Sequence, residues 1–134
     1  MEQTLVIIKP DGVKRKLTGR IIQRFEDKNL LIKEMYQGIV TEAVAKEHYA
    51  HLQDKPFFPD LIAYMTSGPV VFLLLEGTDV IALVRQLLGA TNVLNAAAGT
   101  IRGDFASSTT ENIVHASDSK ESAEVEIQRF FSHL

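Results

Sequence analysis

Cysteine is absent from the 134-residue sequence. A disulfide framework and a thiolate metal site are therefore excluded. A basic tract is also missing: the net charge is −3, and acidic and basic residues are mixed along the chain. We therefore expect no stable nucleic-acid binding, because such binding needs a concentrated positive surface. An anionic ligand would instead be bound by a few local cations.

Long hydrophobic segments are missing too. The longest apolar run extends from Val70 to Leu75, far short of the ~20 residues that cross a bilayer. The first residues carry no basic segment, and the apolar run that follows them ends at Lys9, so the pattern does not predict a signal peptide. We expect a cytoplasmic protein without membrane association. Its length and its 46% hydrophobic content predict a single domain over residues 1–134.

Two kinds of apolar pattern alternate along the chain. Short runs rich in branched residues predict strands over residues 4–8, 30–40, 70–76 and 113–114. Apolar residues at helical spacing predict helices over residues 19–28, 79–88 and 119–132, and two shorter helices after Thr41 and Pro59. Without its insertions the order is βαββαβ, which predicts an α+β fold of the ferredoxin-like type. This fold has a four-stranded antiparallel sheet with helices on one face, here with an inserted helical hairpin.

Polar residues mark the ends of several elements. The segment Lys9–Gly12 is a turn signature after the first strand. Asn29 is a plausible left-handed residue at the end of the first helix. Asp118 is expected to cap the last helix, with Glu121 three residues later completing a capping box.

Residues 90–110 have no clear periodicity, and small or polar residues dominate there. We expect a long loop before the last strand, and loops of this length are often functional. This one contains Thr91, Asn92 and Arg102. The planar guanidinium of an arginine can bind two phosphate oxygens at once.

His115 follows the short strand 113–114 and precedes Ser117, Asp118 and the last helix. Side chains on a helix lean toward its N-terminus, so Glu126 can point back at this histidine. A neutral imidazole is a competent nucleophile near neutral pH, and a carboxylate can fix its tautomer. The residues alone leave two interpretations open: phosphoryl transfer, or a structural histidine with satisfied hydrogen bonds.

Phosphoryl transfer would also require cations, and Lys9, Arg85 and Arg102 are candidates. Lys9 ends a strand but belongs to no P-loop motif, and it could equally be a solvated residue. Arg85 could equally stabilise the C-terminus of its helix. Tyr49 and Phe57 are either core residues or aromatic surfaces for a base, and the sequence does not separate these possibilities.

Two other histidines, His48 and His51, are three residues apart on a predicted helix. No carboxylate or further histidine completes a metal site at a recognised spacing, so we do not predict one there.

The segment 112–119 resembles the active-site signature of nucleoside diphosphate kinases, Asn-Ile-Val-His-Ala-Ser-Asp-Ser. The resemblance covers nearly the whole chain. Its other motifs follow in the family's order and spacing: Ile8–Gly12, Glu47–Tyr49, Pro56–Phe58, Ser67–Val70 and Gly99–Phe105.

The resemblance implies a ping-pong kinase that maintains nucleoside triphosphate and deoxynucleoside triphosphate pools. His115 would take the γ-phosphate of a triphosphate such as ATP, as pros-phosphohistidine, and pass it to a diphosphate such as GDP. Glu126, Ser117 and Lys9 would support the transfer, and Mg²⁺ would be bound mainly through the nucleotide phosphates. The resemblance implies these nucleotide-binding residues: Lys9, Tyr49, Phe57, Arg85, Thr91, Arg102 and Asn112. It also implies a homo-oligomer, either a tetramer, a hexamer or a dimer.

Three positions depart from the family's usual pattern. Val93 and Ala98 stand where prolines are often found, in a loop that often packs between subunits, so they bear on assembly. Ala116 stands where glycine is more usual, and it would be strained if that position required a positive φ. Two other classes of function remain on the same fold: a nucleotide-binding module without catalysis, and a phosphohistidine carrier that serves another protein.

Overall fold

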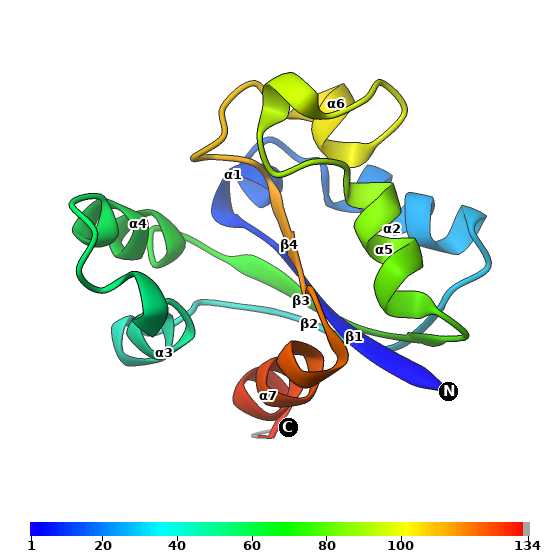
Figure 1. The fold of residues 1–134 in the computed structure, drawn as a ribbon, viewed down its shortest axis with the longest axis horizontal. Helices are drawn as coiled ribbons and strands as arrows, with labels where there is room; N and C mark the ends of the chain where they lie inside the picture. Colours follow the sequence, from blue (N-terminus) through cyan, green and yellow to red (C-terminus); the bar gives the residue numbers. More distant parts are fainter. Residues whose placement is uncertain (133–134) are drawn as a thin grey trace.

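The computed structural model describes residues 1–132, and its centre is a four-stranded sheet (Figure 1). Neighbouring strands are antiparallel throughout, and their spatial order is β2-β3-β1-β4. The strands are β1 (Glu2–Ile8), β2 (Leu31–Gly38), β3 (Val70–Gly77) and β4 (Val114–Ala116). The predicted ferredoxin-like α+β fold is confirmed.

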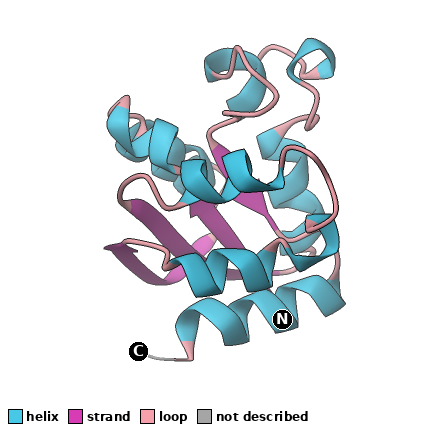
Figure 2. Ribbon diagram, turned by 90° about the vertical axis from the view of Figure 1, so that its left-hand side faces the viewer, coloured by secondary structure: helices cyan, strands magenta, loops and turns pink. Residues whose placement is uncertain are grey.

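Helices cover both faces of the sheet, whereas the sequence interpretation placed them on one (Figures 1 and 2). The helices are α1 (Pro10–Lys14), α2 (Thr18–Asp27), α3 (Glu42–His48), α4 (Phe58–Met65), α5 (Val80–Leu88), α6 (Ile101–Phe105) and α7 (Lys120–Phe131). Two single turns of 3₁₀-helix are η1 (Ala50–Leu52) and η2 (Val93–Asn95). None of the helices in residues 1–132 combines the length and apolar character needed to span a membrane.

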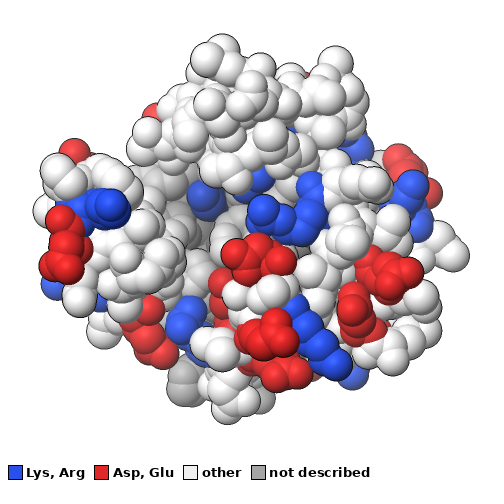
Figure 3. Space-filling view, in the orientation of Figure 1, with Lys and Arg blue, Asp and Glu red and all other residues white. Residues whose placement is uncertain are grey.

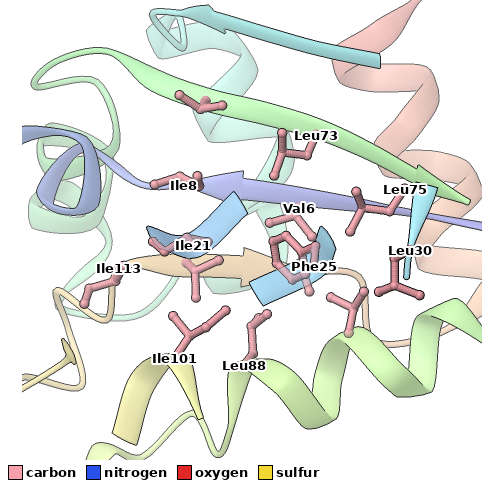
Figure 4. Packing of buried hydrophobic residues seen from close by; sticks show 14 of the residues in the cluster. Val6, Ile8, Ile21, Phe25, Leu30, Leu73, Leu75, Leu88, Ile101 and Ile113 are labelled. Atoms are coloured by element: carbon pink, nitrogen blue, oxygen red, sulfur yellow. The ribbon is translucent and has the colours of Figure 1, made fainter. Parts of the chain in front are cut away.

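The two helical layers arise because β1 is apolar on both sides. Val6 and Ile8 belong to one buried cluster, which includes residues of α2 and α5 (Figure 4). Leu5 and Ile7 belong to a second cluster, which includes residues of α3, α4 and α7. Successive residues of a strand point to opposite faces, so both faces of β1 need a helical cover.

Local details differ from the predictions at three places. Residues 10–14 form the short helix α1 and not a simple turn, because Pro10 has the φ angle that a first helical residue needs. The loop before β4 contains η2 and α6, which are too short to show periodicity; Thr100 caps α6 by accepting a hydrogen bond from the Gly103 amide. Ser119, and not Asp118, caps α7, because its hydroxyl accepts the Ser122 amide.

Backbone strain lies at Ile113 and not at Ala116. Ile113 has a φ of 76°, which a β-branched residue rarely adopts, whereas Ala116 is not among the residues with positive φ. Asn29 does have the expected left-handed conformation, with a φ of 60°. The Ile113 carbonyl accepts the backbone N–H of Lys9 at 2.7 Å. Alanine at position 116 therefore carries no left-handed strain, and the strained residue connects β1 to the segment that leads into β4.

Candidate active site

His115 is the central residue of β4, opposite Ile7 of β1. Its Nε2 lies 3.0 Å from Oε1 of Glu126, which projects from the second turn of α7. Because a carboxylate accepts, Nε2 carries the proton of the neutral ring, and Nδ1 keeps its lone pair for a ligand or an electrophile. The sequence inference that Glu126 points back at His115 is confirmed by this geometry.

Ser117 contacts the same carboxylate oxygen. Its buried hydroxyl donates to Oε1 of Glu126 at 2.6 Å. Burial acts to raise the pKa of Glu126, but the hydrogen bond and charge of His115, together with the Ser117 bond, outweigh it and hold that pKa below its usual range. Glu126 is therefore an anionic acceptor with two donors on one oxygen.

Three cations reach the same cleft from different elements. Lys9, at the end of β1, is 8% exposed, and its Nζ donates to Oδ1 of Asn112 at 2.8 Å. Arg102 of α6 is 4% exposed and donates to the carbonyls of Gly89 and Val114. Arg85 of α5 donates to the carbonyl of Ala116, directly after His115. In Figure 3, which has the orientation of Figure 1, Lys and Arg atoms (blue) gather in a hollow near the centre of the view.

Burial makes these charges costly in the absence of a ligand. It lowers the pKa of Lys9 to about 8, with a further contribution from the charge of Arg102. It also lowers the pKa of Arg102 to about 10, and the charge of Arg85 adds to this effect. Two buried polar atoms of cleft-lining residues, Nε of Arg102 and the hydroxyl of Tyr49, have no hydrogen-bond partner among the described residues. A bound anion would stabilise the cations.

The cleft has a volume of about 670 Å³. Most of the predicted site residues line it: Lys9, Tyr49, Arg85, Thr91, Arg102, Asn112, His115 and Glu126. Ser117 lies buried behind Glu126. Phe57 does not line the cleft; it precedes α4, and half of its surface is exposed. The core interpretation therefore does not hold for Phe57, whereas Tyr49 both packs in the core and lines the cleft.

Several residues that line the cleft were not predicted as site residues, and two of them, His48 and Arg129, contact each other. His48, the last residue of α3, is buried, and its ring centroid lies 4.9 Å from that of His115. Arg129 of α7 lies beside it. Glu126 and Arg129 are three residues apart and share a helix face, which was the only sequence signal. For His48 the only signal was its place in the Glu47–Tyr49 motif of the resemblance, because no local pattern brings α3 to α7.

Comparisons with known proteins agree over the whole chain. The family model described as nucleoside diphosphate kinase matches residues 2–134. The chain belongs to the nucleoside diphosphate kinase family. The nucleoside diphosphate kinase of Acetivibrio thermocellus is 54% identical over 134 residues, which is 100% of this chain and 98% of the relative. That of Methanothermobacter thermautotrophicus is also 54% identical, over 98% of this chain and 87% of the relative.

Solved structures of the family show the same fold. The apo nucleoside diphosphate kinase of Encephalitozoon cuniculi superposes with a TM-score of 0.95 at 44% identity, covering 98% of this chain and 89% of that one. The enzyme of Halobacterium salinarum, solved in complex with CDP, has a TM-score of 0.94 at 45% identity, with coverages of 97% and 87%. The family and the enzyme class predicted from the sequence, nucleoside diphosphate kinase, are confirmed.

Proposed function

We propose that the cleft transfers the γ-phosphate of a nucleoside triphosphate to a nucleoside diphosphate through pros-phosphohistidine on His115. The hydrogen bond between Nε2 and Glu126 is the observation that carries this proposal, because it directs the lone pair of Nδ1 toward the ligand. A bond from Nδ1 to the γ-phosphorus forms while the bond to the bridging oxygen breaks, and the diphosphate leaves. A second diphosphate then takes the phosphoryl group by the reverse step.

Lys9, Arg85 and Arg102 are proposed to bind the phosphate oxygens. Charge spreads over these oxygens in the transition state, and fixed cations in a partly dry cleft stabilise it without reorganisation. Ser117 supports Glu126, and through it the tautomer of His115. Thr91, Asn112 and Tyr49 are proposed to bind the remaining phosphate and sugar oxygens, since each lines the cleft and carries a polar group. The relative solved with CDP supports a nucleotide as the ligand.

Mg²⁺ is proposed to enter with the nucleotide. Among residues 1–132, one group of three potential metal ligands lies close together, His48, His115 and Glu126. Its two imidazoles do not suit Mg²⁺, which prefers oxygen ligands and keeps several waters. Asp118 and Glu121 line the same cleft and offer carboxylate oxygens that suit such a hydrated ion. When bound, Mg²⁺ would offset negative charge on the phosphates.

A phosphate-transfer experiment tests the function. The protein is mixed with γ-labelled ATP, freed of nucleotide and then given unlabelled GDP. We expect an acid-labile, alkali-stable label that moves to GTP. A protein that takes no label would be a binding module, and a label that GDP fails to discharge would indicate a phosphohistidine carrier; either result would contradict the proposal.

Phe57 is proposed to stack on the base, and alanine at this position should weaken nucleotide binding. The expected loss is ~1–3 kcal/mol, the usual contribution of one aromatic stacking on a base. Stability should change little, because half of the side chain is already in solvent. Calorimetric titration with several diphosphates checks the effect, and thermal unfolding is the control. An unchanged affinity would exclude Phe57 from the binding site.

The pH dependence of binding should report on Lys9. Nucleotide affinity is expected to fall as pH rises through about 8, where Lys9 loses its charge. The unfolded chain binds this proton up to about pH 10.5, so between about pH 8 and 10.5 the contribution of Lys9 to stability should rise with pH. Binding and stability therefore change in opposite directions as the pH rises.

Calorimetric titrations and unfolding measurements from about pH 7 to 9.5 check these two opposite trends. In Lys9→Arg, which stays charged, the fall in affinity should disappear; a wild-type affinity constant over this range would contradict the assignment.

We also propose a homo-oligomer, which the exposed edge of the sheet supports. The edge strand β2 and the residue just after it expose three large apolar side chains, those of Leu31, Met35 and Ile39. An edge strand of this kind is a surface that a second chain can cover. The number of subunits (two, four or six), the cytoplasmic location and the single domain over residues 1–134 stay predictions.

A further inference from the structure

A histidine–arginine pair lies beside His115 and has no role in the proposed transfer. Nη1 of Arg129 is 2.8 Å from Nδ1 of His48. The pair joins the end of α3 to α7, and Arg129 lies one turn beyond Glu126. Both partners are shielded from solvent: His48 is buried, and the side chain of Arg129 is 13% exposed. On its other side, Nε of Arg129 lies 3.3 Å from Oε1 of Glu47, which orients the guanidinium.

This contact determines where the His48 ring carries its proton. A guanidinium can only donate, so Nδ1 of His48 must accept, and the neutral ring carries its hydrogen on Nε2. Protonation of the ring would place an N–H at Nδ1 against the N–H of Arg129. Burial, chiefly, lowers the pKa of His48 to about 3; the charges of His115, Arg129 and Lys9 act in the same direction, and Glu126 opposes them.

The protonation state of His48 matters because its ring lies next to the His115–Glu126 pair. The rings of His48 and His115 are nearly perpendicular, at 86°. One ligand atom each of His48, His115 and Glu126 lies within 4.8 Å of the others. A positively charged His48 would therefore compete with His115 for the carboxylate of Glu126. A neutral His48 leaves that carboxylate to His115.

We propose that Arg129 is a positioning residue, which holds His48 as the neutral Nε2–H tautomer. Glu126 then remains bonded to His115, and His48 offers the cleft an uncharged N–H donor. The expected effect on rate rests on the proposed function of His115, whereas the tautomer does not depend on it.

Nitrogen NMR of the full chain with ¹⁵N-labelled histidine tests the tautomer. We expect wild-type His48 to give one Nε2–H form from about pH 5.5 to 8.5, the range in which an ordinary histidine titrates. Arg129→Met should produce a mixture of the two neutral tautomers, because burial, the chief cause of the low pKa of His48, remains. Arg129→Lys should restore the wild-type pattern, because an ammonium also donates. Gln128→Met, the same change at an exposed neighbour on α7, is the matched control and should change nothing.

Two spectral outcomes would overturn the proposal: an Nδ1–H or charged His48 in the wild type, or an unaltered His48 in Arg129→Met. The wild-type spectrum alone decides the tautomer, so the proposal is testable even if a variant does not fold.

The rate of His115 phosphorylation gives the second readout. In Arg129→Met it should be up to about tenfold slower, the effect of one lost hydrogen bond, and Arg129→Lys should restore most of the wild-type rate. An equal deficit in Arg129→Met and in Arg129→Lys would indicate a purely structural role and would overturn the positioning role. A wild-type protein that takes no label would contradict the proposed function, while the NMR result would still decide the tautomer.

Discussion

Replacing His115 with alanine should lower phosphate transfer by at least about 10³-fold, because the substitution removes the nucleophile of the proposed reaction. Nucleotide binding should persist, since Lys9, Arg85 and Arg102 remain in place. The fold should persist too, because Glu126 keeps its bond from Ser117 and the His115 side chain is already 22% exposed.

Labelling with γ-labelled ATP and calorimetric titration with a diphosphate measure these two effects separately. His51→Ala removes an exposed histidine at the edge of the cleft and is the matched control, which should keep its label. If His115→Ala turned over substrate at the wild-type rate, the phosphohistidine on His115 would be wrong.

Arg102→Met should abolish most activity with little change in stability. Two carbonyls, of Gly89 and Val114, lose a donor, at a cost of ~1–3 kcal/mol each. Against this, the buried charge disappears. Its pKa is depressed from 12.5 to about 10, which corresponds to about 3 kcal/mol of relieved destabilisation at ~1.4 kcal/mol per unit. The two effects largely offset each other, so we expect the free energy of unfolding to change by no more than about 3 kcal/mol.

The loss of activity in Arg102→Met has no such compensation. An arginine that stabilises a transferring phosphoryl group commonly contributes about 10³-fold or more to the rate. Single-turnover labelling of His115 measures the rate, and urea unfolding measures the stability. Arg20→Met, at an exposed arginine of α2, controls for the loss of one positive charge. A folded Arg102→Met protein with near-normal activity would remove Arg102 from the proposed site.

The His115–Glu126 pair was predictable because both residues depend on local geometry. A short strand ends near a helix start, and the tilt of helical side chains directs a residue in the second turn back toward that start. The four strands were also predictable, since branched apolar runs between turn residues are a strong local signal. Most of the cleft followed from the family's motifs, which report tertiary arrangements that periodicity does not encode.

Other features depend on contacts that no local pattern reports. The second helical layer is needed because successive residues of β1 belong to two buried clusters, one on each face of the sheet. A short, fully apolar strand does not indicate which helices pack on its two faces. The helix α6 has five residues, fewer than two turns, so its apolar face leaves no recognisable spacing. His48 joins the site only because α3 packs near α7, about 80 residues later in the chain.

The position of β1 between β3 and β4 has a consequence for how the protein is made. Lys9 and Asn112 are 103 residues apart, and Leu5 and Ser117 are 112 apart, yet both pairs are bonded in the finished cleft. The ribosome must therefore release more than 100 further residues after β1 before β4 can pair with it. Contacts of such long range form slowly, because a long loop must be closed first. A ligand stabilises only a state that binds it. Nucleotide therefore cannot assist the early stages of folding, and its binding reports that the last strand and helix have docked.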